Sequence, residues 1–148
     1  MREEELTVGM VMQKHVVTIP HYATVKDAAF KAKEKNVSYL VVIKEDEAVG
    51  IMTDRDIVLR VVAEGKDPEM VLVREIMSSP TIVAIPEMPI NEASMSMVKN
   101  GIKKLPVVDK KGHLIGILTH TDLLTTYPGR IDFLRELIRV RTGEEIIL

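Results

Sequence analysis

The stretch GIMTDRDIVLR, residues 50–60, changes character at its threonine: apolar residues precede Thr53, and a helix-like mixture of charged and apolar residues follows it. The arrangement returns as GILTHTDLLTT, residues 116–126, so both stretches share the pattern Gly-x-x-Thr-x-x-Asp. A threonine followed three residues later by an acid is typical of a helix N-terminus, where each side chain accepts a hydrogen bond from the other residue's backbone N–H. The pattern therefore predicts two equivalent junctions, each leading from a strand into a helix.

The two junctions close two longer repeats, residues 8–62 and 73–127. Each repeat starts with a short extended piece that ends at a proline, and continues with apolar residues at helical spacing. An apolar run, a polar turn and a second apolar run then lead into the junction, so the predicted order is β-α-β-β-α. The expected strands lie at 16–19, 39–43 and 49–52 in the first repeat and at 82–85, 105–108 and 114–118 in the second.

One repeat of this length has a marginal core by itself, and two copies packed around a near-twofold axis would share a larger one. We therefore expect an α/β (α+β) fold with pseudo-twofold symmetry. Its expected parts are the first repeat at 7–72, the second repeat at 73–129 and a C-terminal tail at 130–148. The tail carries apolar residues on one helical face, which predicts an amphipathic helix.

Bulk composition excludes several classes of protein. The chain has 148 residues, no cysteine and a formal net charge of -2, which rules out a disulfide framework and disfavours nucleic-acid binding. No apolar run approaches the roughly 18 residues of a membrane helix, and the acidic start does not resemble a signal peptide. We expect a cytoplasmic protein without membrane contact. The histidines lack metal-ligand spacing and no serine lies in a nucleophile elbow, so we expect neither enzyme activity nor a cofactor.

Two interpretations of the junctions are open. In the first, Thr53 with Asp56 and Thr119 with Asp122 are simply helix caps. In the second, the hydroxyl and the backbone N–H groups at the helix start bind a phosphate, and the carboxylate accepts both hydroxyls of a ribose. The repetition would then provide two nucleotide pockets.

The double junction, the LPVVD run at 105–109 and the Val-Met and Ile-Met pairs at 11–12 and 76–77 together resemble a pair of CBS motifs, the regulatory repeat named for cystathionine β-synthase. The resemblance covers about residues 8–127 and implies an adenosine nucleotide, or S-adenosylmethionine, in a cleft between repeats, and homodimers shaped as flat discs. It assigns these residues to the nucleotide: Asp56 and Asp122 to the ribose, Thr53 and Thr119 to the ribose or phosphate, Ile51 and Ile117 to the base, Ile82 and Val83 over the Asp56 site, and Val17 and Thr18 over the Asp122 site.

The two pockets differ in their basic residues. Lys103 and Lys104 precede the LPVVD run, and His120 lies inside the second junction, so we expect Asp122 to mark the better phosphate site. The first junction contains Arg55, which could donate to a phosphate with its forked guanidinium. The lysines and Arg55 are equally well explained as ordinary surface charges, and His120 is better explained as an ordinary surface histidine.

The function expected from these features is a regulatory sensor that binds AMP, ADP or ATP and controls an effector on another polypeptide. Two alternatives are open: a dimerisation scaffold whose pockets bind nothing, and a module that binds S-adenosylmethionine. Stabilisation by a nucleotide distinguishes a sensor from a scaffold, because a ligand that binds only the folded state raises stability.

Overall fold

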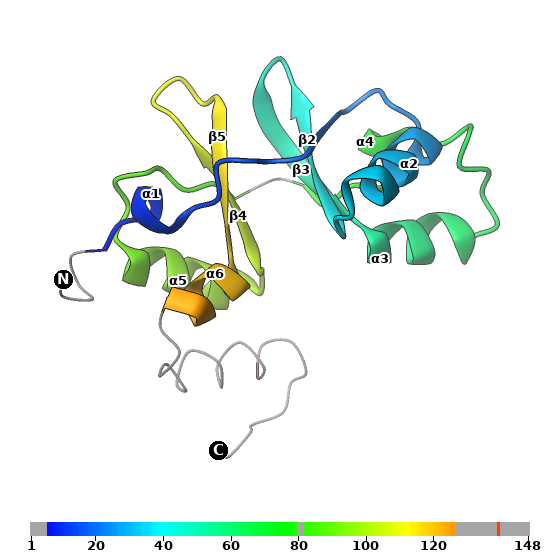
Figure 1. Ribbon diagram of the computed structural model, residues 1–148. Coiled ribbons are helices and arrows are strands. Elements are labelled where there is room, and N and C mark those ends of the chain that lie inside the picture. The colour runs from blue at the N-terminus through cyan, green and yellow to red at the C-terminus, as the bar shows by residue number, and fades with distance from the viewer. Residues whose placement is uncertain (1–5, 80–81, 127–138, 140–148) are drawn as a thin grey trace. The chain divides into compact units, whose positions relative to one another are not determined.

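The computed structural model describes residues 6–79, 82–126 and 139 of the chain. The chain divides into two compact units (Figure 1). Among the described residues, the first, called the Asp56 unit, comprises 15–79, 82 and 111–114, and the second, called the Asp122 unit, comprises 6–14, 83–110, 115–126 and 139. Among the described residues, no helix combines the length and the apolar character that crossing a bilayer requires.

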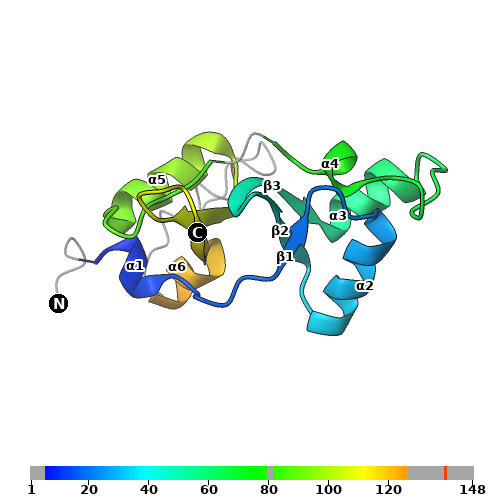
Figure 2. The same cartoon turned by 90° about the horizontal axis from the view of Figure 1, so that it is seen from above.

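The Asp56 unit contains a three-stranded sheet in the order β1-β2-β3. Strand β1 (Thr18–Pro20) pairs parallel with β2 (Tyr39–Lys44), which pairs antiparallel with β3 (Glu47–Thr53). Parallel neighbours need a crossover, and helix α2 (Val25–Lys35) provides it. Helices α2 and α3 lie on the same side of this sheet in both views (Figures 1 and 2).

Local signals fix the ends of α2. The Thr24 hydroxyl accepts a hydrogen bond from the Asp27 N–H at 3.1 Å, with the same Thr-x-x-Asp spacing as the two junctions. The helix ends at Asn36, which adopts the left-handed conformation with φ 55°. In the turn between β2 and β3, Glu45 and Asp46 both have positive φ, at 51° and 66°. Two successive positive φ values are typical of a type I′ turn, which suits the twist of a hairpin.

The Asp122 unit contains helix α5 (Ile90–Asn100), strands β4 (Lys104–Val108) and β5 (Leu114–Thr119), and helix α6 (His120–Thr126). The strand predicted at 82–85 is reduced to one parallel pair, Ala84 with Val107. Proline explains the difference: in the Asp56 unit the Val41 N–H donates to Val17 O at 3.0 Å, whereas Pro106 at the matching position has no N–H to donate.

Two four-residue helices each pack in the unit that is formed mainly by the other repeat. Helix α1 (Val8–Val11) opens the first repeat but packs in the Asp122 unit, where the Val8 N–H donates to Met88 O and the Gly9 N–H donates to Pro86 O, both at 2.9 Å. Helix α4 (Val73–Ile76) opens the second repeat but packs in the Asp56 unit, where the Val73 N–H donates to Ala23 O at 2.8 Å. The packing therefore divides the chain differently from the boundaries expected at 7–72 and 73–129.

Each unit has its own apolar core, and each core includes residues of the exchanged helix. The core of the Asp56 unit consists of Ile19, Val25, Ala28, Leu40, Val42, Met52, Val61, Val73 and Ile76. The core of the Asp122 unit consists of Val8, Ala84, Ile90, Ala93, Met97, Leu105, Val107, Leu118 and Leu123. The β-α-β-β-α order predicted for the repeats is confirmed in the first repeat, and in the second with its first strand reduced to the Ala84–Val107 pair. The amphipathic helix expected within 130–148 lies outside the described residues, apart from position 139.

The helices that follow the two junctions differ. Helix α3 (Asp54–Ile57) continues into a π-helical turn, η2 (Val58–Val62), in which the Ala63 N–H donates to Val58 O at 2.9 Å. Helix α6 is α-helical from His120 to Thr126. A π-turn widens a helix by one residue and is often found at functional sites. The two junctions thus share their first turn and differ one turn later.

Candidate functional site

The first junction is a complete capping box at the start of α3. The Asp56 N–H donates to the Thr53 hydroxyl at 3.2 Å, and the Thr53 N–H donates to Asp56 Oδ2 at 2.9 Å. Asp56 is buried, with 9% of its surface exposed. These two bonds fix the carboxylate at the point where β3 enters α3.

The second junction reproduces this geometry at the start of α6. The Asp122 N–H donates to the Thr119 hydroxyl at 3.2 Å, and the Thr119 N–H donates to Asp122 Oδ2 at 2.8 Å. The interpretation as a helix cap is thus confirmed at both junctions. The cap does not use the full hydrogen-bonding capacity of the carboxylates, because an ionised aspartate offers about four acceptor positions and the cap uses one of them.

The glycine of each junction is required by a close approach of the chain. A side-chain carbon at Gly116 would lie 2.7 Å from Met12 Sδ and 2.9 Å from the carbonyl oxygen of Gln13. At Gly50 it would lie 2.6 Å from Met77 Sδ and 2.9 Å from Ser78 O. The segments that follow α1 and α4 therefore cross directly over the two glycines, one segment in each unit.

These crossings form two matching backbone bridges. In the Asp122 unit, Gln13 and Ile117 exchange N–H to carbonyl hydrogen bonds, both at 2.9 Å. In the Asp56 unit, Ser78 and Ile51 do the same at 2.9 and 3.1 Å. Each bridge lies two residues before the junction threonine.

The second oxygen of each carboxylate has a partner that sequence reasoning missed. Arg60 Nη1 lies 3.6 Å from Asp56 Oδ1, and the same nitrogen donates to Ile76 O at 2.6 Å. At the other junction, the side-chain amide of Gln13 donates to Asp122 Oδ1 at 2.9 Å. Helical spacing could have suggested Arg60, which follows Asp56 by four residues. No local signal points to Gln13, because the contact depends on the exchanged segment.

The remaining predicted site residues are distributed over both units. Ile117 is fully buried, whereas its counterpart Ile51 is half-buried, so the two positions expected along the base are not equivalent. Arg55 is exposed, and its backbone N–H donates to Asp54 Oδ1 at 2.8 Å. The backbone N–H of His120 donates to the carbonyl oxygen of Lys103 at 2.9 Å, which holds Lys103 and Lys104 at the start of β4 beside the second junction.

The residues expected over each carboxylate stay predictions. Val17 and Thr18, expected over the Asp122 site from the other repeat, belong to the Asp56 unit. Ile82 belongs to the Asp56 unit and Val83 to the Asp122 unit, and both side chains are 37% exposed.

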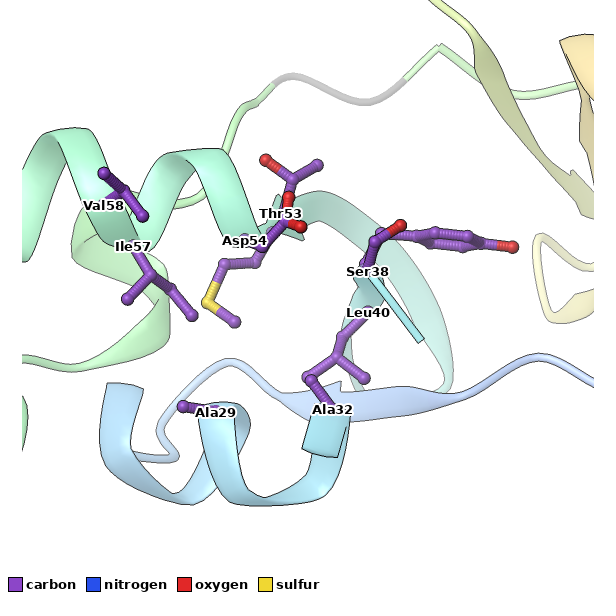
Figure 3. A pocket seen from close by; sticks show the side chains of 10 residues that line it. Ala29, Ala32, Ser38, Leu40, Thr53, Asp54, Ile57 and Val58 are labelled. Atoms are coloured by element: carbon purple, nitrogen blue, oxygen red, sulfur yellow. The ribbon is translucent and has the colours of Figure 1, made fainter. Parts of the chain in front are cut away.

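A cavity of about 230 Å³ lies in the Asp56 unit, between α2 and the β3–α3 segment (Figure 3). In Figure 3, Ile57 and Leu40 project from opposite elements toward the side of α2 that carries Ala29 and Ala32. Asp56 is not part of its lining, which is mostly apolar. The lining consists of Ala29, Ala32, Ser38, Tyr39, Leu40, Met52, Thr53, Asp54, Ile57 and Val58. This cavity is therefore separate from the junction carboxylate.

Two β-α-β-β-α repeats, each with a capped Thr-x-x-Asp junction, define the class of protein. The family model of the CBS domain matches residues 8–63 and 73–129, and the chain belongs to the CBS-domain family as a tandem pair. This confirms the resemblance that the double junction indicated.

Particular proteins resemble the chain over most of its length. An uncharacterized protein of Methanopyrus kandleri is 40% identical over 132 residues, which cover 88% of this chain and 67% of the relative. The crystal structure of the CBS domain pair of protein MJ0100, in complex with 5′-methylthioadenosine and S-adenosyl-L-methionine, has a TM-score of 0.72 and 28% identity, and covers 84% of this chain and 97% of that one. A hexameric CBS-CP12 protein from bloom-forming cyanobacteria has a TM-score of 0.72 and 35% identity, and covers 88% and 70%.

Proposed function

We propose that this CBS pair is a regulatory module that binds an adenosine nucleotide (AMP, ADP or ATP) at its Thr-x-x-Asp junctions and controls a separate partner protein. The observation that carries the proposal is the twin junction: Asp56 and Asp122 are held by the same two backbone-linked bonds and keep acceptor positions for a ribose diol. Further support comes from the MJ0100 pair, whose bound compounds both contain an adenosine moiety.

The nucleotide would act as a regulatory ligand, not as a cofactor of a reaction catalysed by this chain. A ligand shifts a conformational equilibrium only as far as it binds one arrangement better than another. An adenosine nucleotide that favours one arrangement of the chain would present a different surface to the partner. The effect of binding would therefore be read on the partner's activity.

S-adenosylmethionine is the second candidate ligand, favoured by its presence in the MJ0100 complex. Its sulfonium is cationic where a nucleotide carries anionic phosphate. Lys103 and Lys104 close to the Asp122 junction favour the nucleotide at that site by charge.

Thermal unfolding of the full chain with AMP, ADP, ATP or S-adenosylmethionine tests the proposal. At a ligand concentration of 100 Kd a true site adds about 2.7 kcal/mol of stability, and for a chain of this size each kcal/mol raises Tm by about 2–4 °C. A rise with a nucleotide supports the sensor, and a rise with S-adenosylmethionine alone assigns the ligand to that compound. If none of the four compounds changes Tm, the chain is a scaffold and the proposed function is wrong.

We also propose that two copies of the chain associate. Val58 lines the cavity of the Asp56 unit and is 54% exposed, while Val62 and Phe30 are 68% and 65% exposed. Apolar side chains this open, beside an apolar cavity, gain free energy when a second surface covers them. The hexameric assembly of the related CBS-CP12 protein supports self-association.

A further inference from the structure

The two junction carboxylates are alike at one oxygen and different at the other. Oδ2 accepts the backbone N–H of the junction threonine in both cases, at 2.9 Å for Asp56 and 2.8 Å for Asp122. Oδ1 of Asp56 faces the guanidinium of Arg60 at 3.6 Å, whereas Oδ1 of Asp122 accepts a hydrogen bond from the neutral amide of Gln13 at 2.9 Å. The chemical difference between the two sites therefore lies at Oδ1, the carboxylate oxygen that the helix cap does not use.

The position of Gln13 is set by its backbone. Its N–H and carbonyl groups both pair with Ile117 on β5, each at 2.9 Å, two residues before Thr119. The segment is held further by α1, whose Val8 is fully buried in the core of the Asp122 unit. Because the backbone is fixed at both ends of this short segment, the Gln13 side chain is directed to the carboxylate by the fold.

An amide and a guanidinium make different second partners for a ribose site. A guanidinium carries donors only, whereas the side-chain amide of glutamine carries two donors and a carbonyl acceptor. When the Gln13 nitrogen donates to Asp122, its carbonyl oxygen remains as an acceptor next to the carboxylate. Two adjacent acceptor groups match two adjacent hydroxyls, such as O2′ and O3′ of a ribose.

We propose that Gln13 is a specificity-determining residue of the Asp122 site, and that it selects ligands carrying an intact ribose diol. The proposal rests on the proposed function and deepens it, because it names the part of the ligand that this residue recognises. The amide orients the carboxylate toward one hydroxyl and accepts a hydrogen bond from the other. At the Asp56 site Arg60 offers no acceptor, so discrimination between ribose and deoxyribose is weaker there.

The test compares AMP with 2′-deoxy-AMP by titration calorimetry on the full chain. Asp56→Ala serves as the parent, so that binding reports the Asp122 site. A single neutral hydrogen bond is worth about two- to tenfold in affinity. We expect Gln13→Ala to lower the preference for AMP over 2′-deoxy-AMP by about two- to tenfold, chiefly through weaker AMP binding, with 2′-deoxy-AMP affinity nearly unchanged. Lys14→Ala, at the exposed neighbouring position, is the matched control and should leave the preference unchanged.

Four results would overturn the proposal, and they are distinguishable. If Gln13→Ala weakens both ligands equally, Gln13 has only a structural role in the segment that follows α1. If the substitution lowers the preference by the same factor when Asp122 is already alanine, Gln13 does not act together with the carboxylate. If wild-type protein binds AMP and Gln13→Ala changes nothing, this inference fails while the proposed function stands. Absence of binding of either compound to wild-type protein would overturn both.

Discussion

At the scale of single residues, the junction aspartates have two tasks: they cap a helix, and under the proposed function they receive a ribose. An asparagine at the same position keeps a carbonyl oxygen for the threonine N–H but loses the negative charge. The two tasks can therefore be separated by comparing alanine with asparagine. Helix capping alone would be retained largely by asparagine, whereas ribose binding through a carboxylate would not.

We predict that Asp122→Ala weakens adenosine-nucleotide binding by about ten- to 150-fold, because a hydrogen-bonding charge is worth about 1.5–3 kcal/mol. Asp56→Ala should change a separate binding event. Titration calorimetry on both variants measures the effect, and Asp122→Asn with Asp56→Asn are the matched controls for the loss of the cap. Unchanged binding in both alanine variants would contradict the assignment of the carboxylates to the ligand.

The junction glycines lead to a prediction about stability. Gly116→Ala places a methyl group 2.9 Å from the Gln13 carbonyl oxygen and 2.7 Å from Met12 Sδ. The sulfur can move, but the carbonyl is held by its hydrogen bond from the Ile117 N–H. We expect the free energy of unfolding to fall by about 1–3 kcal/mol, as is usual for overpacking, and Gly50→Ala to behave alike. Denaturant unfolding measures this. A variant as stable as wild type would mean that the crossing segments do not lie over the glycines.

At the scale of elements, the turn between β2 and β3 carries a residue poorly suited to its conformation. Glu45 adopts φ 51°, a region that costs most L-residues roughly 1–2 kcal/mol and that asparagine tolerates better. We predict that Glu45→Asn raises the stability of the Asp56 unit by about 0.5–1 kcal/mol, measured by denaturant unfolding. Glu47→Asn, just inside β3, is the control and should not stabilise the chain, because asparagine is disfavoured in strands. Destabilisation by Glu45→Asn would contradict the turn type.

The exchange of α1 and α4 predicts which unit a substitution in either helix weakens. The sequence repeat alone would predict the opposite unit in each case. Val8 and Val73 are both fully buried, the first in the core of the Asp122 unit and the second in that of the Asp56 unit. We expect Val8→Ala and Val73→Ala each to cost about 1.5–3 kcal/mol, from lost burial and a residual cavity.

Native-state hydrogen exchange of the two variants would show which unit each substitution weakens. Val8→Ala should speed exchange in α5 and leave α2 unaffected, and Val73→Ala should do the opposite. The two variants are each other's controls. Faster exchange in α2 after Val8→Ala would mean that α1 packs with its own repeat.

Elements with strong local signals could be predicted from sequence, and contacts between distant segments could not. The central strands of each repeat and both junction caps depend on spacings of a few residues, and each was found where expected. The shortened first strand of the Asp122 unit results from Pro106, whose effect depends on which strand pairs with it. Gln13 was missed because its contact with Asp122 joins residues far apart in the chain.

At the scale of the whole molecule, the proposed self-association is testable through the open apolar side chains of the Asp56 unit. A carboxylate in an apolar interface is costly to desolvate. We therefore predict that Val62→Asp shifts the chain to a lower mass in size-exclusion chromatography with light scattering. Met70→Asp is the matched control, since Met70 is even more exposed, at 77%, but lies in the connection after η2. A wild-type chain that is already monomeric would contradict the proposal.

The exchange of α1 and α4 between the two units also bears on how such a chain could arise by gene duplication. A polypeptide with one repeat could reproduce both glycine crossings if two molecules exchanged their N-terminal helices, as domain-swapped dimers do. Fusing the two genes would make this exchange intramolecular, so that assembly would depend on a fixed effective concentration and no longer on the protein concentration. Cutting the chain after residue 72 would make assembly depend on protein concentration again, so the two fragments should assemble only when they are mixed.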